Sequence, residues 1–192
     1  MRRLAMVVFI SCVGCGDEKL PSPIQPTPPA QPMSPQPTPP ADSLPNLAGD
    51  YTITFIAKCD GWSSWPILPP EFWSRTYASR LEQNGRDVKV VMTGLPRIFA
   101  PGDPGLWGQI RSDGVVTLTN YYGNDQYDPV DEQVAPTNFV RILVGEMELS
   151  ASPKGLSGTF SGSFSLHDRN GTGWNYIIGH CSSTSHSVTL SR

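Results

Sequence analysis

The sequence contains few charged residues and no excess of basic ones. Asp, Glu, Lys and Arg make up 16% of its 192 positions, and the formal net charge is -3. So little charge argues against a bundle of charged helices. The missing basic excess argues against nucleic-acid binding, because Lys and Arg are needed to neutralise phosphates. The apolar run from Leu4 to Val13 is too short for a helix that crosses a bilayer.

Motifs for metal binding and catalysis are also missing. The histidines His167, His180 and His186 show no H-x-H or H-E-x-x-H spacing, so no metal site and no cofactor are expected. No set of nucleophile, base and orienting acid can be assembled from the sequence. We therefore expect a protein that is not an enzyme.

Glycine and proline, by contrast, are abundant, with 18 and 20 residues. Between Pro21 and Pro45 there are 11 prolines among Ser, Thr, Gln and Ala. Such a segment has little to bury and favours an extended, polyproline-like chain. We predict a disordered Pro-rich linker over 16–47, with a reach of about 90 Å.

The first residues predict export. Arg2 and Arg3 precede the apolar run, as in a signal peptide. Positions 11–15 read Ser-Cys-Val-Gly-Cys, which resembles the lipobox of bacterial lipoproteins. The resemblance implies that Cys15 is lipidated, that 1–15 form the signal peptide and lipobox, and that the protein is lipid-anchored in the bacterial cell envelope. We expect it at the outer membrane, facing the periplasm or the cell surface. Cleavage before Cys12, or an ordinary secretory signal, is the alternative interpretation.

Residues 48–192 are predicted to form one all-β domain, because apolar residues recur there with period two and helical periodicity is absent. Eight strands are expected, at 50–57, 75–83, 87–93, 106–111, 115–120, 140–150, 156–166 and 184–191. Alternation predicts that the core is formed by Tyr51, Ile53, Phe55, Val88, Val90, Met92, Leu143, Met147, Leu149, Leu156, Phe160, Phe164, Leu166, Val188 and Leu190.

The connections predict how these strands are arranged. Tight turns at Asn84-Gly85, Asp113-Gly114 and 153–155 alternate with four long loops, at 58–74, 94–105, 121–139 and 167–183. In an up-and-down arrangement, all tight turns then lie at one end and all long loops at the other.

The cysteines give an independent indication. Without the signal region, only Cys59 and Cys181 remain, and an even pair in an oxidising compartment predicts one disulfide. Cys59 follows the first strand and Cys181 precedes the last, so a bond between them requires these strands to be neighbours. We predict an eight-stranded antiparallel up-and-down β-barrel closed by a Cys59–Cys181 disulfide. A sandwich with Greek-key crossings is the alternative fold.

The loop end is rich in aromatic residues, which provide large contact areas with a polar handle. Because the mouth of a barrel is a common ligand site, we predict that these rings bind a ligand. The predicted ligand-binding residues are Trp62, Trp65, Trp73, Trp107, Tyr121, Tyr122, Trp174 and Tyr176, and Tyr127 lies in the same region. The alternative interpretation is that the rings plug the top of the barrel or pack the long loops.

Two sets of acidic residues are open to a functional interpretation. Asp125, Asp128 and 131–132 crowd the third loop, but their spacing is not that of a calcium-binding loop, so a solvated acidic loop is expected. Glu146 and Glu148 could form a carboxylate pair for glycoside hydrolysis. Alternation places both outside the barrel, where they serve solubility.

The domain also resembles known groups of proteins. Gly49-Asp50-Tyr51 at the start of an eight-stranded meander is similar to the lipocalin and avidin group, which implies a small apolar ligand. The pattern that starts at 47–51 looks like uncharacterised bacterial lipoproteins with a Pro-rich leader, and it continues through Cys59, 75–77, 161–164 and 181–183 to the closing segment 185–192. We therefore expect a monomeric binding protein for a small hydrophobic ligand or a glycan. A structural or protein-interaction module displayed on the envelope is the alternative.

Overall fold

The computed structural model describes residues 44–192 except 96–97, 99–101, 123–125 and 171–175. The predicted signal peptide, Cys15 and most of the predicted linker lie outside this part. The elements are β1 (Gly49–Ile56), η1 (Pro70–Phe72), β2 (Ser74–Asn84), β3 (Asp87–Met92), β4 (Gly105–Ile110), β5 (Val116–Thr119), β6 (Tyr121–Tyr122), β7 (Gln126–Tyr127), β8 (Val130–Gln133), β9 (Asn138–Ser152), β10 (Gly155–Asp168) and β11 (Tyr176–Ser191). Within the described ranges, no helix has the length and apolar character needed to cross a membrane.

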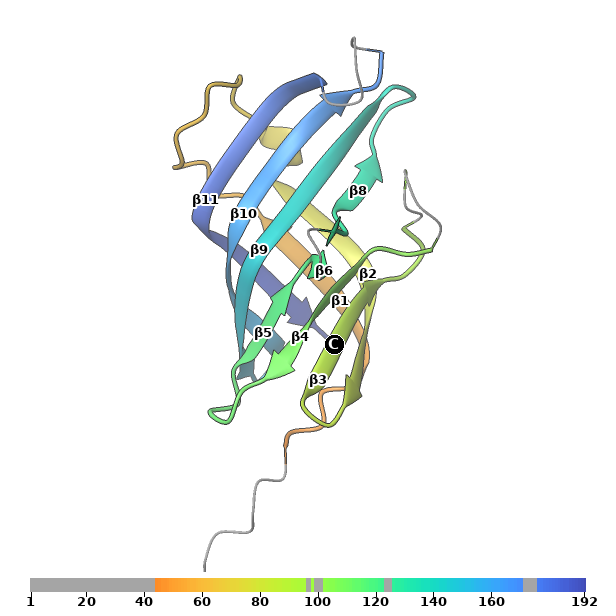
Figure 1. Ribbon diagram of the computed structural model, residues 1–192, viewed down its shortest axis with the longest axis vertical. Coiled ribbons are helices and arrows are strands. Elements are labelled where there is room, and N and C mark those ends of the chain that lie inside the picture. Colours follow the sequence, from red (N-terminus) through yellow and green to blue (C-terminus); the bar gives the residue numbers. More distant parts are fainter. Residues whose placement is uncertain (1–43, 96–97, 99–101, 123–125, 171–175) are drawn as a thin grey trace, which may run out of the picture. The chain divides into compact units, whose positions relative to one another are not determined.

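Eight of the strands close into an antiparallel barrel (Figure 1). The order around the barrel is β1, β2, β3, β4, β5, β9, β10 and β11, and β11 pairs with β1 to complete the ring. Every neighbour in this order is also the next barrel strand along the chain. The predicted all-β, up-and-down barrel is therefore confirmed, and the Greek-key sandwich is excluded.

A disulfide joins Cys59 to Cys181 beside the pairing of β1 with β11, as predicted. It spans 122 positions of the sequence. Beyond the end of β1, the 58–69 segment continues the hydrogen bonding to β11. The Gly61 N–H donates to the Ser182 carbonyl, and the Leu68 N–H donates to the His180 carbonyl. The seam of the barrel is thus held by backbone hydrogen bonds and by one covalent bond.

Large side chains fill the barrel interior. Phe55 and Phe160 meet edge to face with ring centroids 5.6 Å apart, and Phe164 packs against Phe160 at 6.0 Å. All three rings are at most 1% exposed. His186 also points inward, between the rings of Phe160 and Phe164. The sequence left open whether the interior is filled or hollow, and these residues occupy it.

The prediction that Leu143 is a core residue is wrong. The pair Ser161 and Glu146 is followed along the ladder by Gly162 and Val144, so Gly145 is an extra residue in β9. A bulge of one residue reverses the faces of the strand beyond it. Val144 is therefore buried and faces inward, whereas Leu143 lies on the outer face and is partly exposed.

Two of the predicted long loops are largely strand. β11 begins at Tyr176 instead of near 184. The pairing of β11 with β10 shifts register between Phe160 and Gly162, and this shift interrupts the alternation of inward and outward residues along β11. The third loop contains β6, β7 and β8. β8 pairs with β9 over 139–142, beyond the point at which β5 ends. One edge of β9 is therefore covered first by β5 and then by β8.

The tight turns lie at one end of the barrel and the long connections at the other, as predicted (Figure 1). The pairing of Asn84 with Asp87 makes Gly85 and Arg86 the two turn residues between β2 and β3. Gly85 has φ of +60°, a conformation that glycine adopts without steric cost.

Candidate functional site

The aromatic residues predicted to bind a ligand lie in three places. Trp62 and Trp65 project from the 58–69 loop, 89% and 46% exposed. Trp73 packs against the core and donates its indole N–H to the Leu68 carbonyl at 2.8 Å. Trp107 and Tyr121 lie together on the flank of the barrel. The side chains of Tyr122 and Tyr176 and all of Trp174 are outside the described part of the chain.

The flank residues form a hollow of about 590 Å³ on the outer face of the barrel near its loop end. This size is typical of small-molecule sites. We call it the flank hollow. It is lined by Trp107, Gly108, Thr117, Leu118, Thr119, Tyr121, Tyr127, Gly145 and Glu146.

The hollow forms where β5 stops pairing with β9. The last paired residues are Leu118 and Met147, and the bulge at Gly145 lies two residues before Met147 in β9. Beyond them, the Thr119 hydroxyl and the Asn120 N–H both donate to the Val144 carbonyl, at 3.2 and 3.1 Å. The chain therefore separates from β9 after Asn120. The outward side chains of β4, β5 and β9 near this point border the hollow.

The β6–β7 hairpin forms the upper border of the hollow. Its base is closed by the Asp128 N–H, which donates to the Asn120 carbonyl at 2.8 Å. The Tyr121 and Tyr127 rings meet edge to face across the hairpin, with centroids 5.1 Å apart. The two rings are 37% and 60% exposed, which is unusual for aromatic side chains that already contact each other. Both side chains are therefore in contact with solvent.

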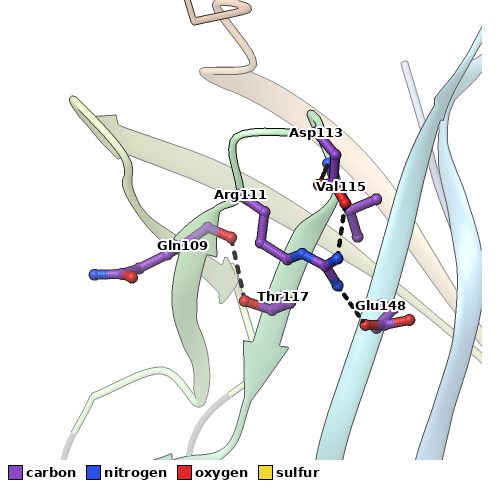
Figure 2. A network of polar contacts seen from close by, with 6 residues as sticks. All are labelled: Gln109, Arg111, Asp113, Val115, Thr117 and Glu148. Atoms are coloured by element: carbon purple, nitrogen blue, oxygen red, sulfur yellow. Dashed lines mark hydrogen bonds and ion pairs between the residues drawn. The ribbon is translucent and has the colours of Figure 1, made fainter.

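A polar network lies on the same strands, and of its residues only Thr117 also lines the hollow. Figure 2 shows Arg111 between two carboxylates, with nitrogen–oxygen distances of 2.7 Å to Asp113 and 2.9 Å to Glu148. Beside it, the Thr117 hydroxyl donates to the Gln109 carbonyl at 3.3 Å. Both Glu148 and the neighbouring Glu146 are exposed on the outer face, as the alternation predicted.

The mouth of the barrel is crossed by a polar bridge. Arg75 of β2 makes a two-bonded ion pair with Glu132 of β8, and the Tyr77 hydroxyl donates to the same carboxylate at 2.8 Å. Burial and the charge of Glu132 raise the pKa of Tyr77, so its hydroxyl stays a donor. This bridge joins β2 to β8 and narrows access to the interior from the loop end.

A second ion pair lies on the outer face above the hollow. Asp131 of β8 accepts two hydrogen bonds from Arg141 of β9, each at 2.8 Å, and its carboxylate is buried. The expectation of a solvated acidic loop is therefore wrong for 131–132. Both residues belong to a strand, and each is neutralised by an arginine that could not be paired with it from sequence spacing.

Ser165 and His167 form a buried contact that the sequence did not indicate. The Ser165 hydroxyl lies 2.7 Å from His167 Nε2, and the imidazole stacks on Phe139 with centroids 4.7 Å apart. Burial, and secondarily the charge of Arg141, lowers the pKa of His167 to about 4, so the ring is neutral at pH 7. Among the described residues its Nδ1 has no hydrogen-bond partner, and thus no acid orients the ring for general-base chemistry.

The other histidines are also in environments that disfavour charge. Burial lowers the pKa of His180 and of His186. His186 Nδ1 accepts a hydrogen bond from the Lys58 N–H at 2.9 Å, which gives it a structural role at the seam. In the part of the chain that the structure describes, no three His, Cys, Asp or Glu side chains are placed to hold a metal ion.

Comparison with known proteins adds no assignment, since the chain matches no protein-family model, no curated protein and no solved structure. Interpretation of the site therefore depends on its own chemistry. Of the residues that line the flank hollow, Trp107 and Tyr121 were predicted to bind a ligand. Tyr127 and Glu146 were not, although strand alternation already placed Glu146 outside. The missing information was the pairing of β5 with β9, which brings them together.

Proposed function

We propose that this protein is a non-enzymatic binding protein of the bacterial cell envelope, anchored by a lipid on Cys15, and that its flank hollow binds a glycan. The observation that carries the proposal is the combination of three accessible aromatic rings with hydroxyl and carboxylate groups in one hollow. Aromatic faces pack against the C–H faces of sugar rings. The Thr117 and Thr119 hydroxyls already donate their protons to backbone carbonyls, so these oxygens and the Glu146 carboxylate supply acceptors for sugar hydroxyls.

A glycan is favoured over a small apolar ligand because of the packing of the described side chains inside the barrel. An apolar ligand of the lipocalin type would occupy the barrel interior, and there Phe55, Phe160 and Phe164 are packed against one another. The flank hollow is open to solvent along one side, which suits an extended, polar chain. The anchor and the Pro-rich linker rest on the sequence pattern alone and complete the proposal.

Binding of soluble oligosaccharides to the full chain in detergent tests this function. We expect a panel that includes N-acetylglucosamine and glucose oligomers to contain binders, measured by calorimetry. Trp107→Ala should weaken binding about tenfold, which corresponds to ~1.4 kcal/mol. Trp65→Ala is the matched control, because it removes an exposed tryptophan outside the hollow. Absence of binding across the panel, or equal losses for both variants, would contradict the proposal.

A second candidate function has its own observation. Trp62, Trp65 and Ile67 are 89%, 46% and 64% exposed on a loop that the disulfide and backbone hydrogen bonds hold in place. Exposed apolar groups on a fixed loop are typical of a protein-interaction surface. An envelope partner that co-purifies with the wild type, but not with Trp62→Ala, would favour this interaction module over the glycan-binding protein.

A further inference from the structure

Glu146 is the one charged side chain among the described residues that line the flank hollow. We propose that the glycan bound there carries a free amino group, and that Glu146 determines this specificity by pairing with the ammonium ion. The inference rests on the proposed function and names the ligand class of the same site.

The two outward carboxylates of β9 differ in their surroundings. Glu148 is ion-paired with Arg111 at 2.9 Å, and Arg111 is also bound to Asp113 (Figure 2). For the Glu146 carboxylate, no hydrogen bond or ion pair exists with any described residue. One negative charge is thus compensated within the protein, whereas the other is available to a ligand.

The backbone around Glu146 is fixed by the same bulge that opens the hollow. The Glu146 N–H donates to the Ser161 hydroxyl of β10 at 3.2 Å, and the preceding Gly145 is the extra residue of the strand. Since Glu146 lies directly after the bulge, its position along β9 is defined relative to Thr119 and the aromatic rings. Glu146 therefore lies at the hollow with its backbone held in place, and its carboxylate is within reach of a ligand bound there.

The aromatic rings favour the same sign of ligand charge. The faces of Trp and Tyr rings attract cations, and this attraction is the basis of aromatic sites for ammonium groups. Trp107 already holds a cation of the protein in this way, because the Lys89 ammonium lies 5.6 Å from the centroid of its ring. We therefore assign the Tyr121 and Tyr127 rings, together with Glu146, to the ammonium group of the ligand.

The experiment compares two oligomers that differ only at the amino group. The glucosamine hexamer has a free amine on each sugar, and the N-acetylglucosamine hexamer has a neutral amide. Affinities for the full chain are measured by calorimetry at pH 6 and low salt. We expect about three- to tenfold tighter binding of the glucosamine hexamer, as befits an exposed ion pair supported by aromatic rings.

Two matched variants assign the effect. Glu146→Gln should abolish the preference, so that the two hexamers bind this variant with equal affinity, because a neutral amide does not pair with an ammonium ion. Glu148→Gln removes the same charge two residues away and should keep the preference. Adding salt should reduce the preference of the wild type, because salt screens exposed charges.

The outcomes separate the two proposals. If the wild type binds both hexamers equally, or prefers the N-acetylated one, the inference about the amino group is wrong while the glycan-binding function stands. Equal effects of the two Glu variants would also contradict it. If neither hexamer nor any other oligosaccharide binds, the glycan-binding function fails, and the inference fails with it.

Discussion

The interior of the barrel and the flank hollow are built by the same strands but have opposite properties. Leu106 of β4, Leu118 of β5 and Met147 of β9 point inward and are at most 2% exposed. Their outward neighbours Trp107 and Glu146 border an open space instead. The difference shows that closing an eight-stranded barrel does not by itself create a binding cavity. The hollow that the described residues line is on the outer face, where one strand stops pairing early.

The largest effect is expected from a cavity in the interior. Phe160→Ala removes a ring that contacts Phe55, Phe164 and His186, and it should lower the free energy of unfolding by about 4 kcal/mol. Urea denaturation of the full chain measures this change. A loss below about 1 kcal/mol would indicate that the interior is loosely filled and could accept a ligand, which would remove the contrast with the flank.

The seam should contribute slightly less. Replacing both Cys59 and Cys181 by Ser opens a loop of 122 positions and should lower the free energy of unfolding by about 3 kcal/mol. Binding to the flank hollow should change little, because the hollow lies on β4, β5 and β9. The check is denaturation and calorimetry on the same variant. A loss of glycan affinity as large as the loss of stability would show that the hollow depends on the seam.

A third prediction concerns pH. The pKa of His167 is lowered to about 4 in the folded protein, against about 6.5 in the unfolded chain. The unfolded state therefore binds a proton first as the pH falls, and stability is lost between about pH 6.5 and pH 4. His167 should account for about 2 kcal/mol of this loss, measured as the difference between the wild type and His167→Gln at pH 7 and pH 4.5. Parallel curves for the two proteins would contradict the assignment.

The smallest effect on stability is expected from the flank hollow itself. Tyr127 is 60% exposed, so Tyr127→Ala should change the free energy of unfolding by less than about 0.5 kcal/mol. The same variant should weaken glycan binding about tenfold, since it removes one ring of the pair with Tyr121. Thermal denaturation and calorimetry give the two numbers. A large loss of stability would show that the ring belongs to the packing of the loops.

Much of the fold follows from the sequence, because alternation and turn residues are local signals that determine the strands and their tight connections. The alternation in β1 and β3 and the glycine turns specify inward faces and tight connections, and the disulfide could be paired from the order of the cysteines. Prediction failed where the register changes. Leu143 was assigned to the core because the bulge at Gly145 has no signal in the sequence beyond the glycine itself.

The site was predictable only in part for a similar reason. Trp107 and Tyr121 were chosen because they are aromatic residues of the loop end. The role that we propose for Glu146 depends on the difference from Glu148, whose ion pair with Arg111 is created by the fold. Likewise, the partners of Asp131 and Glu132 come from other strands, and sequence spacing does not reveal pairs that the fold creates.

The most direct test of the contrast between interior and flank is a residue-resolved NMR titration of the full chain with the glucosamine hexamer. We expect shift changes at the amides of Trp107, Thr119, Gly145 and Glu146, with Phe55, Phe160 and Phe164 unaffected. Changes centred on Phe55, Phe160 and Phe164, with Gly145 and Glu146 unaffected, would contradict it and place the ligand inside the barrel.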